Sequence, residues 1–281
     1  MNKIDRRALF SSGAAAALLA ATGVSLDAAP QPGGRLRLAL PRDGVSLDRL
    51  ARSAALDTLT EIAPNGVLQG ELANSWKSDE ARNWQIDLRE NVRFHDGTTL
   101  TAEDVVSSLC NRDVRSRLKA TLVEPLSATS LRLELVTANP HLPILLADPM
   151  FAICAGGSVD APLASVIGTG CYQTERFQAD RHYLGRKVPD HYKAGQAGWL
   201  DSIEAVVIPD PRIRSEALRD GYVDVAMLPE PGVLQGQDGM SFYPTVENMV
   251  VATRSSVGFP KGSTPADLSD DGRLAERWWR S

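Results

Sequence analysis

A strand–helix–strand pattern in residues 199–228 constrains the fold more than any other part of the sequence. Residues 199–210, WLDSIEAVVIPD, contain a near-continuous apolar run, which is typical of a strand buried on both faces of a sheet. Asp210-Pro211 then starts a helix, because proline fits the first helical turn, and Gly221 ends it. Residues 222–228 form a second apolar strand. A β-α-β unit requires parallel strands and a right-handed crossover, so the sequence predicts an α/β fold.

Residues 91–109, NVRFHDGTTLTAEDVVSSL, contain a histidine and several acids but are explained by local structure. His95-Asp96-Gly97 is a turn, since glycine accepts a positive φ. Thr101 is placed to cap a helix that has Asp104 as its third residue, which is a capping box. The alternation in residues 83–94 predicts a hairpin before this turn. We therefore expect these residues to have a structural role, with a catalytic His/Asp pair as the alternative.

The N-terminal residues have the pattern of an export signal. Arg6 and Arg7 precede an Ala-rich stretch that is too short and too interrupted to span a membrane. An arginine pair followed by apolar residues resembles a twin-arginine signal. We predict a signal in residues 1–28, and an exported, soluble periplasmic protein. No cysteine follows the stretch, so no lipid anchor is expected; a frayed Ala-rich helix is the alternative.

Composition and spacing argue against several function classes. The net charge of −5, without a basic block, predicts no nucleic-acid partner. The scattered histidines and the lack of paired Cys/His spacing predict no metal and no cofactor. The Gly168-Thr169-Gly170 turn lacks the lysine and the following helix of a phosphate loop. No Gly-x-Ser-x-Gly context occurs, so we predict no catalytic residue and a protein that is not an enzyme.

The cysteines leave two states open. Cys110, Cys154 and Cys171 all follow the predicted signal. In an oxidising periplasm two of them can pair, and Cys154 with Cys171 is the preferred pair because both flank a Gly-rich turn region. Three buried, unpaired thiols are the alternative.

Two long stretches resemble the signatures of the extracellular solute-binding proteins of family 5, the peptide/nickel-type binding proteins of ABC importers. The first is ELANSW followed by WQIDLRENVRFHDGTTLTAEDVVSSL, and the second is GTGCY followed by VPDHYKAGQAGWLDSIEAVVIPDPRIRSEALRDGYVDVAML. Both lie in the family's order, within roughly residues 34–255. Two small departures are Cys171 in place of the usual proline and Val188-Pro189-Asp190 in place of the usual Asn-Pro.

The resemblance implies a fold and a place for the ligand. Residues 29–228 are expected to form a periplasmic-binding-protein-like first lobe of the α/β (mixed α+β) class, with a mixed β-sheet flanked by helices. Relatives are roughly twice as long, so residues 229–281 are expected to be a truncated, partly irregular remnant of the hinge and second lobe. Relatives hold the ligand between two lobes that close by hinge bending. Exposed aromatic residues are the expected ligand contacts, namely Tyr172, Phe177 and Tyr192, and ordinary packing of these residues is the alternative.

The expected function is solute capture without catalysis. The chain is interpreted as the periplasmic solute-binding component of an ABC-type peptide or oligopeptide importer. Its expected partners are a peptide or other small solute and an ABC permease in the inner membrane, and it is expected to be a monomer. One alternative is a truncated or degenerate paralogue that binds a partner protein or no ligand. Another is an exported enzyme that uses the scattered histidine and serine residues.

Overall fold

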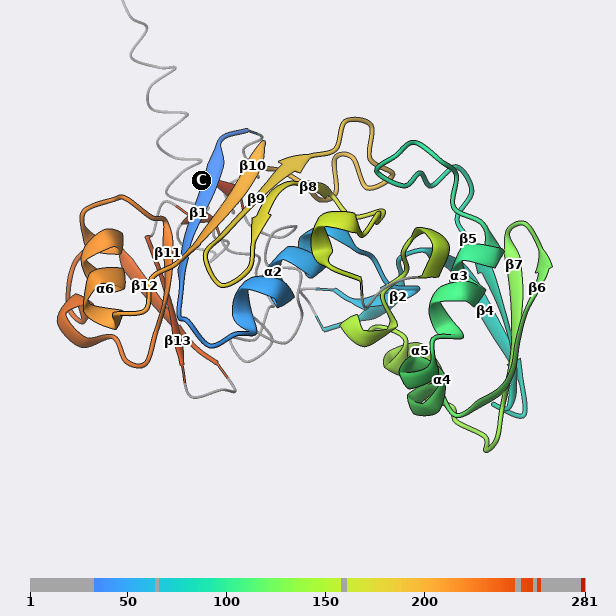
Figure 1. Ribbon diagram of the computed structural model, residues 1–281. Coiled ribbons are helices and arrows are strands. Elements are labelled where there is room, and N and C mark those ends of the chain that lie inside the picture. Colours follow the sequence, from blue (N-terminus) through green and yellow to red (C-terminus); the bar gives the residue numbers. More distant parts are fainter. Residues whose placement is uncertain are drawn as a thin grey trace, which may run out of the picture.

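The computed structural model describes residues 33–63, 66–157, 161–245, 249–254, 257–258 and 279–280. Figure 1 shows two larger sheets toward opposite ends of the molecule, with helix α2 (Ser46–Ala55) and strand β2 (Thr60–Ile62) between them. The predicted export signal, with Arg6 and Arg7, lies outside the described residues. Within the described part of the chain, no helix is long and apolar enough to cross a membrane.

The first sheet has seven strands, of which β1 (Arg35–Leu40) is the middle one. β1 pairs in parallel with β10 (Ser202–Val207) and with β11 (Val225–Leu228). On one side β9 (His182–Lys187) is antiparallel to β10 and β8 (Tyr172–Gln178) is antiparallel to β9. On the other side β13 (Val250–Arg254) is antiparallel to β11 and β12 (Met240–Pro244) is antiparallel to β13. The mixed sheet confirms the predicted fold class, and the predicted β-α-β unit inserts β1 between its two strands.

Helix α6 (Pro211–Arg219) joins β10 to β11 as its sequence signals predict. The side chain of Asp210 accepts a hydrogen bond from the backbone N–H of Arg212 at 2.8 Å, and Pro211 occupies the first turn. Gly221 has a φ of +80°, the left-handed conformation that ends helices. One face of the sheet packs against α6 through a cluster that includes Ala39 and Leu218.

Helix α2 covers the opposite face of the same sheet. Leu47, Leu50 and Ala54 of the helix share a core cluster with Leu36 and Leu38 of β1. Helices on both faces of a partly parallel sheet are the α/β arrangement. The carboxyl ends of β1, β10 and β11 therefore lie at one edge of the sheet, where ligands bind in open α/β folds.

The second sheet has four antiparallel strands in the order β4-β5-β7-β6. They are β4 (Ala73–Asp79), β5 (Asn83–Leu88), β7 (Ser130–Leu135) and β6 (Ala120–Ser127). The predicted hairpin within residues 83–94 is wrong, because β5 pairs with β4 and β7. The turn comes earlier, where Arg82 N–H donates to the carbonyl of Asp79 at 3.1 Å.

Helices pack against and beside this second sheet. α3 (Ala102–Leu109) begins with the predicted capping box: the Thr101 side chain accepts from the backbone N–H of Asp104, and the backbone N–H of Thr101 donates to the Asp104 carboxylate at 2.9 Å. α3 is followed by α4 (Arg112–Leu118) and α5 (Leu142–Leu145). Short 3₁₀ turns follow: η1 (Pro149–Phe151), η2 (Ala155–Gly157), η3 (Leu163–Ser165) and, in the other half, η4 (Gly232–Leu234).

The chain passes from the first sheet to the second and back along two adjacent segments. It leaves after α2, builds the small hairpin of β2 and β3 (Leu68–Gly70) and the four-stranded sheet, and returns before β8. The N–H of Gly170 donates to the carbonyl of Ala55 at 3.0 Å, and Asp57 forms a β-bridge with Ile153. The outgoing and returning segments are thus hydrogen-bonded to each other.

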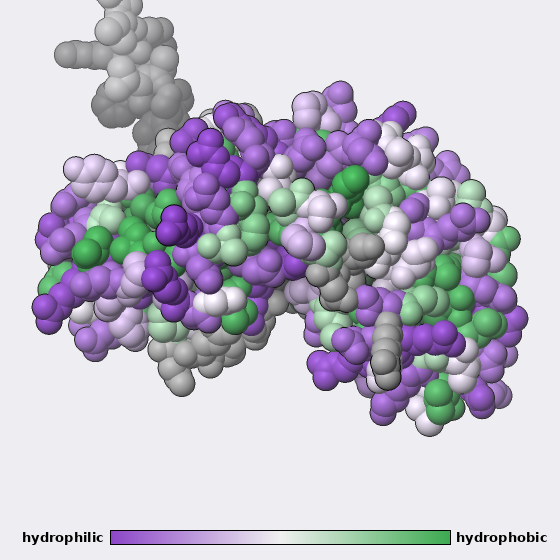
Figure 2. All heavy atoms as spheres, in the orientation of Figure 1, coloured by the Kyte–Doolittle hydropathy of each residue, from purple (hydrophilic) through white to green (hydrophobic). Residues whose placement is uncertain are grey.

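Residues beyond the expected boundary at 228 contribute strands to the first sheet. β12 and β13 extend it past β11, and β14 (Val257–Gly258) pairs separately with β15 (Trp279–Arg280). In the view of Figure 2, hydrophilic residues predominate on the described surface, and hydrophobic residues form small separate patches.

Candidate functional site

A cavity of about 610 Å³ opens beside the loop that follows β1. One wall comes from this loop and α2, and the other from α4 and the segment around η1. The lining is Gly44, Val45, Asp48, Arg49, Arg52, Ser53, Leu56, Thr58, Asp113, Val114, Ala147, Pro149, Met150 and Ala152. Its volume suits a small ligand, and it lies toward the edge where the parallel strands end.

The walls of this cavity carry charges of both signs. Arg49 and Arg52 lie on α2, with Asp48 beside them and Asp113 on the opposite wall. Arg52 Nε donates to Asp48 at 2.7 Å, and its Nη2 donates to the carbonyl of Ala161 at 3.1 Å. The arrangement suits a solute that bears both a cationic and an anionic group alongside apolar parts.

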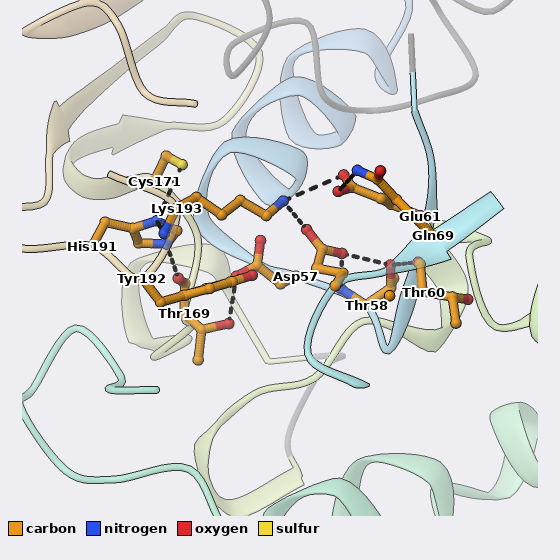
Figure 3. Close-up of polar contacts among 12 residues, drawn as sticks. Asp57, Thr58, Thr60, Glu61, Gln69, Thr169, Cys171, His191, Tyr192 and Lys193 are labelled. Carbon is orange, nitrogen blue, oxygen red and sulfur yellow. Dashed lines mark hydrogen bonds and ion pairs between the residues drawn. The ribbon is translucent and has the colours of Figure 1, made fainter. Parts of the chain in front are cut away.

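A buried polar network lies next to the cavity and shares Thr58 with it (Figure 3). The ammonium of Lys193 lies 2.5 Å from Glu71 Oε1 and 3.3 Å from Glu61 Oε2. The other oxygen of Glu71 accepts from both the backbone N–H and the hydroxyl of Thr58, at 2.9 Å each. Gln69 donates to Glu61 at 2.6 Å. The two bonds of Lys193 join the loop that holds it to Glu61 and Glu71, and the other three bonds link residues of the segment from Thr58 to Glu71 to one another.

Asp57 forms a second part of this network. Its Oδ2 accepts from the hydroxyl of Thr169 at 2.8 Å and from the hydroxyl of Tyr192 at 2.9 Å. Asp57 and Thr169 are both fully buried. Because Asp57 lies on the outgoing segment and Thr169 on the returning one, the bond from Thr169 ties these two segments together, and the bond from Tyr192 ties Asp57 to the loop between β9 and β10.

Two histidines hold the Gly168-Thr169-Gly170 turn. His95 donates from its backbone N–H to Gly168 at 2.9 Å, and its Nε2 lies 2.8 Å from the carbonyl of Gly170. His191 Nε2 lies 2.7 Å from the carbonyl of Thr169, while the N–H of Lys193 donates to its Nδ1 at 3.1 Å. An Nδ1 that accepts leaves the proton on Nε2. Burial lowers the pKa of His95, so the neutral form suits its role in holding this turn.

The expected aromatic ligand contacts do not line the cavity. Tyr172 is fully buried, and its hydroxyl accepts from the N–H of Leu200 at 3.2 Å. Phe177 is half-buried against the core beneath α2, and Tyr192 belongs to the Asp57 network. Their contact with a ligand stays a prediction.

The three cysteines are free thiols, so the preferred Cys154–Cys171 pair is not formed. Each buried thiol has its own surroundings: the Cys154 backbone N–H donates to the Ser108 hydroxyl, and Cys171 Sγ lies 3.5 Å from His191 Nδ1. Burial raises the pKa of Cys154. The alternative of unpaired thiols is confirmed, although Cys110 is half-exposed rather than buried.

Sequence reasoning missed the charged members of the network. Lys193 lies 122 positions from Glu71 and 132 from Glu61, in segments that look like polar loops. The described residues contain no group of three or more His, Cys, Asp or Glu side chains placed to hold a metal ion.

Comparison with known proteins identifies the fold's relatives. The profile of the bacterial extracellular solute-binding proteins, family 5 middle region, matches residues 67–256. The chain belongs to this family. Solved structures with a similar fold include the binding protein AgaA of A. tumefaciens R10 in complex with agropinic acid, with a TM-score of 0.66 and 24% identity over 75% of this chain. DppA of Helicobacter pylori, an ABC transporter-associated periplasmic binding protein in complex with the peptide STSA, has a TM-score of 0.66 at 20% identity over 75% of this chain.

Curated relatives of this family-5 chain have different roles. The nickel-binding protein NikA of Staphylococcus aureus is 29% identical over 57% of the chain, and the HTH-type transcriptional regulator SgrR of Escherichia coli K12 is 28% identical over 54%. The chain spans about half the length of the two solved structures, 48% and 50%. The matched regions make up 35% of NikA and 28% of SgrR. The family assignment therefore covers the solute-binding fold, and what this chain binds is a separate question.

Proposed function

We propose that this chain captures a small solute in the periplasm for an ABC-type importer of peptides or oligopeptides. The observation that carries the proposal is the cavity of about 610 Å³ beside the loop after β1. In open α/β sheets, ligands bind outside the carboxyl ends of parallel strands. Delivery to an inner-membrane permease, export through the Arg6-Arg7 signal and capture without catalysis belong to the same proposal.

A peptide is the solute class that best suits the charges of the cavity. A short peptide has an ammonium at one end and a carboxylate at the other, and Asp113 and Arg49 lie on opposite walls. The apolar lining, such as Met150 and Val114, suits uncharged side chains. The peptide complex of the H. pylori neighbour supports the same class.

Thermal unfolding with a panel of dipeptides to pentapeptides tests the proposal. A ligand that binds only the folded state stabilises it by about 2.7 kcal/mol at a hundredfold excess over Kd, so a binding peptide raises the Tm measurably. Asp113→Ala is expected to reduce the shift. Asp238→Ala, which changes an exposed aspartate outside the cavity lining, is the matched control.

Two outcomes contradict the proposal. No Tm shift with any peptide at millimolar concentration rules out peptide capture and favours the alternative of a protein-interaction module. A shift that Asp113→Ala and Asp238→Ala reduce equally places the peptide outside this cavity.

A further inference from the structure

Lys193 is a buried cation that does not line the cavity but is linked to it. It lies in the loop between β9 and β10, and only 8% of its surface is exposed. Glu71, its nearest ion-pair partner, is fully buried. Burying two charges is unfavourable unless the pair and its hydrogen bonds are well formed, and here each charge has further partners: Glu61 for the lysine and Thr58 for Glu71.

A continuous set of bonds leads from Lys193 to both walls. Glu71 receives the ammonium on one oxygen and holds Thr58, a lining residue, with the other. The hydroxyl of Thr58 also lies 2.6 Å from the carbonyl of Thr60. Thr60 in turn donates to the carbonyl of Pro143 in α5, at 2.6 Å. α5 leads directly into residues 147–152, which form part of the opposite wall of the cavity. Thr58 comes soon after α2, which forms the first wall.

We propose that Lys193 is a positioning residue of the cavity: through Glu71 it fixes Thr58 and with it the separation of the two walls. The inference rests on the proposed function in that the cavity is taken as the ligand site. Lys193 is outside the cavity lining and does not contact the ligand. It acts through its ion pair with Glu71, whose carboxylate accepts from Lys193 on one oxygen and from Thr58 on the other.

The variants are chosen by the charge that each one removes. Lys193→Met keeps an unbranched side chain, shorter than lysine by one heavy atom, and removes its charge, which leaves Glu71 as a buried carboxylate without its cation. Glu71→Gln removes the matching negative charge and retains an oxygen that can accept from Thr58. The double variant therefore restores the net charge that Lys193, Glu71 and Glu61 have together in the wild type, and it keeps the acceptor for Thr58 while Glu61 loses its cation. Lys77→Met, at an exposed lysine of β4, is the matched control.

Three measurements on the full chain test the anchor, which is the hydrogen bonding of Thr58 to Glu71. Hydrogen exchange of the Thr58 amide, followed by NMR, reports its bond to Glu71. Spin labels at Arg49→Cys and Asp113→Cys, in a Cys110→Ser background, report the distance across the cavity. Titration with the peptide that gives the largest Tm shift reports affinity.

Lys193→Met is expected to accelerate Thr58 exchange at least tenfold, to broaden the interspin distance distribution and to weaken peptide binding about tenfold. The double variant is expected to return all three toward wild type, and Lys77→Met to change none. Unchanged Thr58 exchange in Lys193→Met overturns the proposal, as does a double variant no better than Lys193→Met.

If Lys193→Met does not fold, the double variant tests the proposal by itself. A double variant that folds and protects the Thr58 amide from exchange as the wild type does supports the proposal. A double variant that does not fold, or that no longer protects the Thr58 amide, overturns it. The exchange and distance measurements need no ligand. If no peptide binds the wild type, the proposed function fails while the anchor is still tested.

Discussion

Arg214 holds the carboxyl ends of two strands of the first sheet, and its removal gives a sharp prediction. The side chain is 2% exposed. Its Nε donates to the carbonyl of Met227 at 2.6 Å, and its Nη1 donates to those of Ile208 at 2.6 Å and Pro209 at 3.0 Å. Burial lowers the pKa of Arg214. Arg214→Ala removes all three bonds between α6, the end of β10 and the end of β11.

The expected loss of stability follows from these bonds. A hydrogen bond from a charged donor contributes about 1.5–3 kcal/mol, and a buried acceptor left without a partner loses a similar amount. Taking about 1.5–2.5 kcal/mol for each of the two bonds of 2.6 Å, and assuming that water replaces the third bond, we expect Arg214→Ala to cost about 3–5 kcal/mol. This is a large part of the 5–15 kcal/mol that is usual for a folded domain.

Urea unfolding followed by circular dichroism measures the effect. With a slope of about 3 kcal/mol per molar urea, the midpoint should fall by about 1–1.7 M. Arg212→Ala, at an exposed arginine of the same helical turn, should shift it by less than about 0.2 M. Arg214→Lys should lie between, because lysine keeps the charge but not the fork of donors. Equal midpoints for Arg214→Ala and Arg212→Ala would refute the reasoning.

Three further predictions concern the turn held by histidines and the thiols. Because the pKa of His95 is lowered in the folded state, the unfolded state binds the proton first as the pH falls. The contribution of His95 to the free energy of unfolding is therefore complete above a pH of about 6.5 and decreases below it, by up to about 1.4 kcal/mol per pH unit. Urea midpoints measured from pH 7.5 to 5 should decrease less steeply with falling pH in His95→Gln than in the wild type, and an equal dependence on pH would contradict this. Gly168→Ala would place a Cβ 2.0 Å from a backbone oxygen of α2, so we expect a loss of about 3 kcal/mol, seen as a lower Tm; an unchanged Tm would show that the turn can move. Cys110 should react with a thiol reagent in the native protein and Cys154 and Cys171 only after unfolding, and a total below three thiols in denaturant without reductant would reveal a disulfide.

Local signals predicted the elements whose causes are local. The helix of residues 211–219 follows from Asp210, Pro211 and Gly221, each of which acts within a few positions of its partner. The capping box of Thr101 and Asp104 is of the same kind. Such elements need no knowledge of the rest of the molecule, so sequence alone defines them.

Elements that depend on distant partners escaped prediction. Strand β4 buries only Ala73 and half-buries Trp76, so its sequence lacks the alternation that predicts a strand, and its pairing with β5 decides its conformation. Glu71 looks like a surface residue in the sequence, yet it is fully buried because Lys193 reaches it from another loop. The cavity could not be predicted either, because its walls come from segments that only the fold brings together.

The two hydrogen-bonded crossings make the segment between α2 and β8 an insertion with adjacent ends. Gly170 is hydrogen-bonded directly to Ala55, so the strands of the seven-stranded sheet before and after this segment can pair whatever the segment contains. A cassette attached in this way can be lengthened, trimmed or exchanged while the register of the strands on either side is preserved. In evolution, one wall of the cavity can therefore be recast independently of the other.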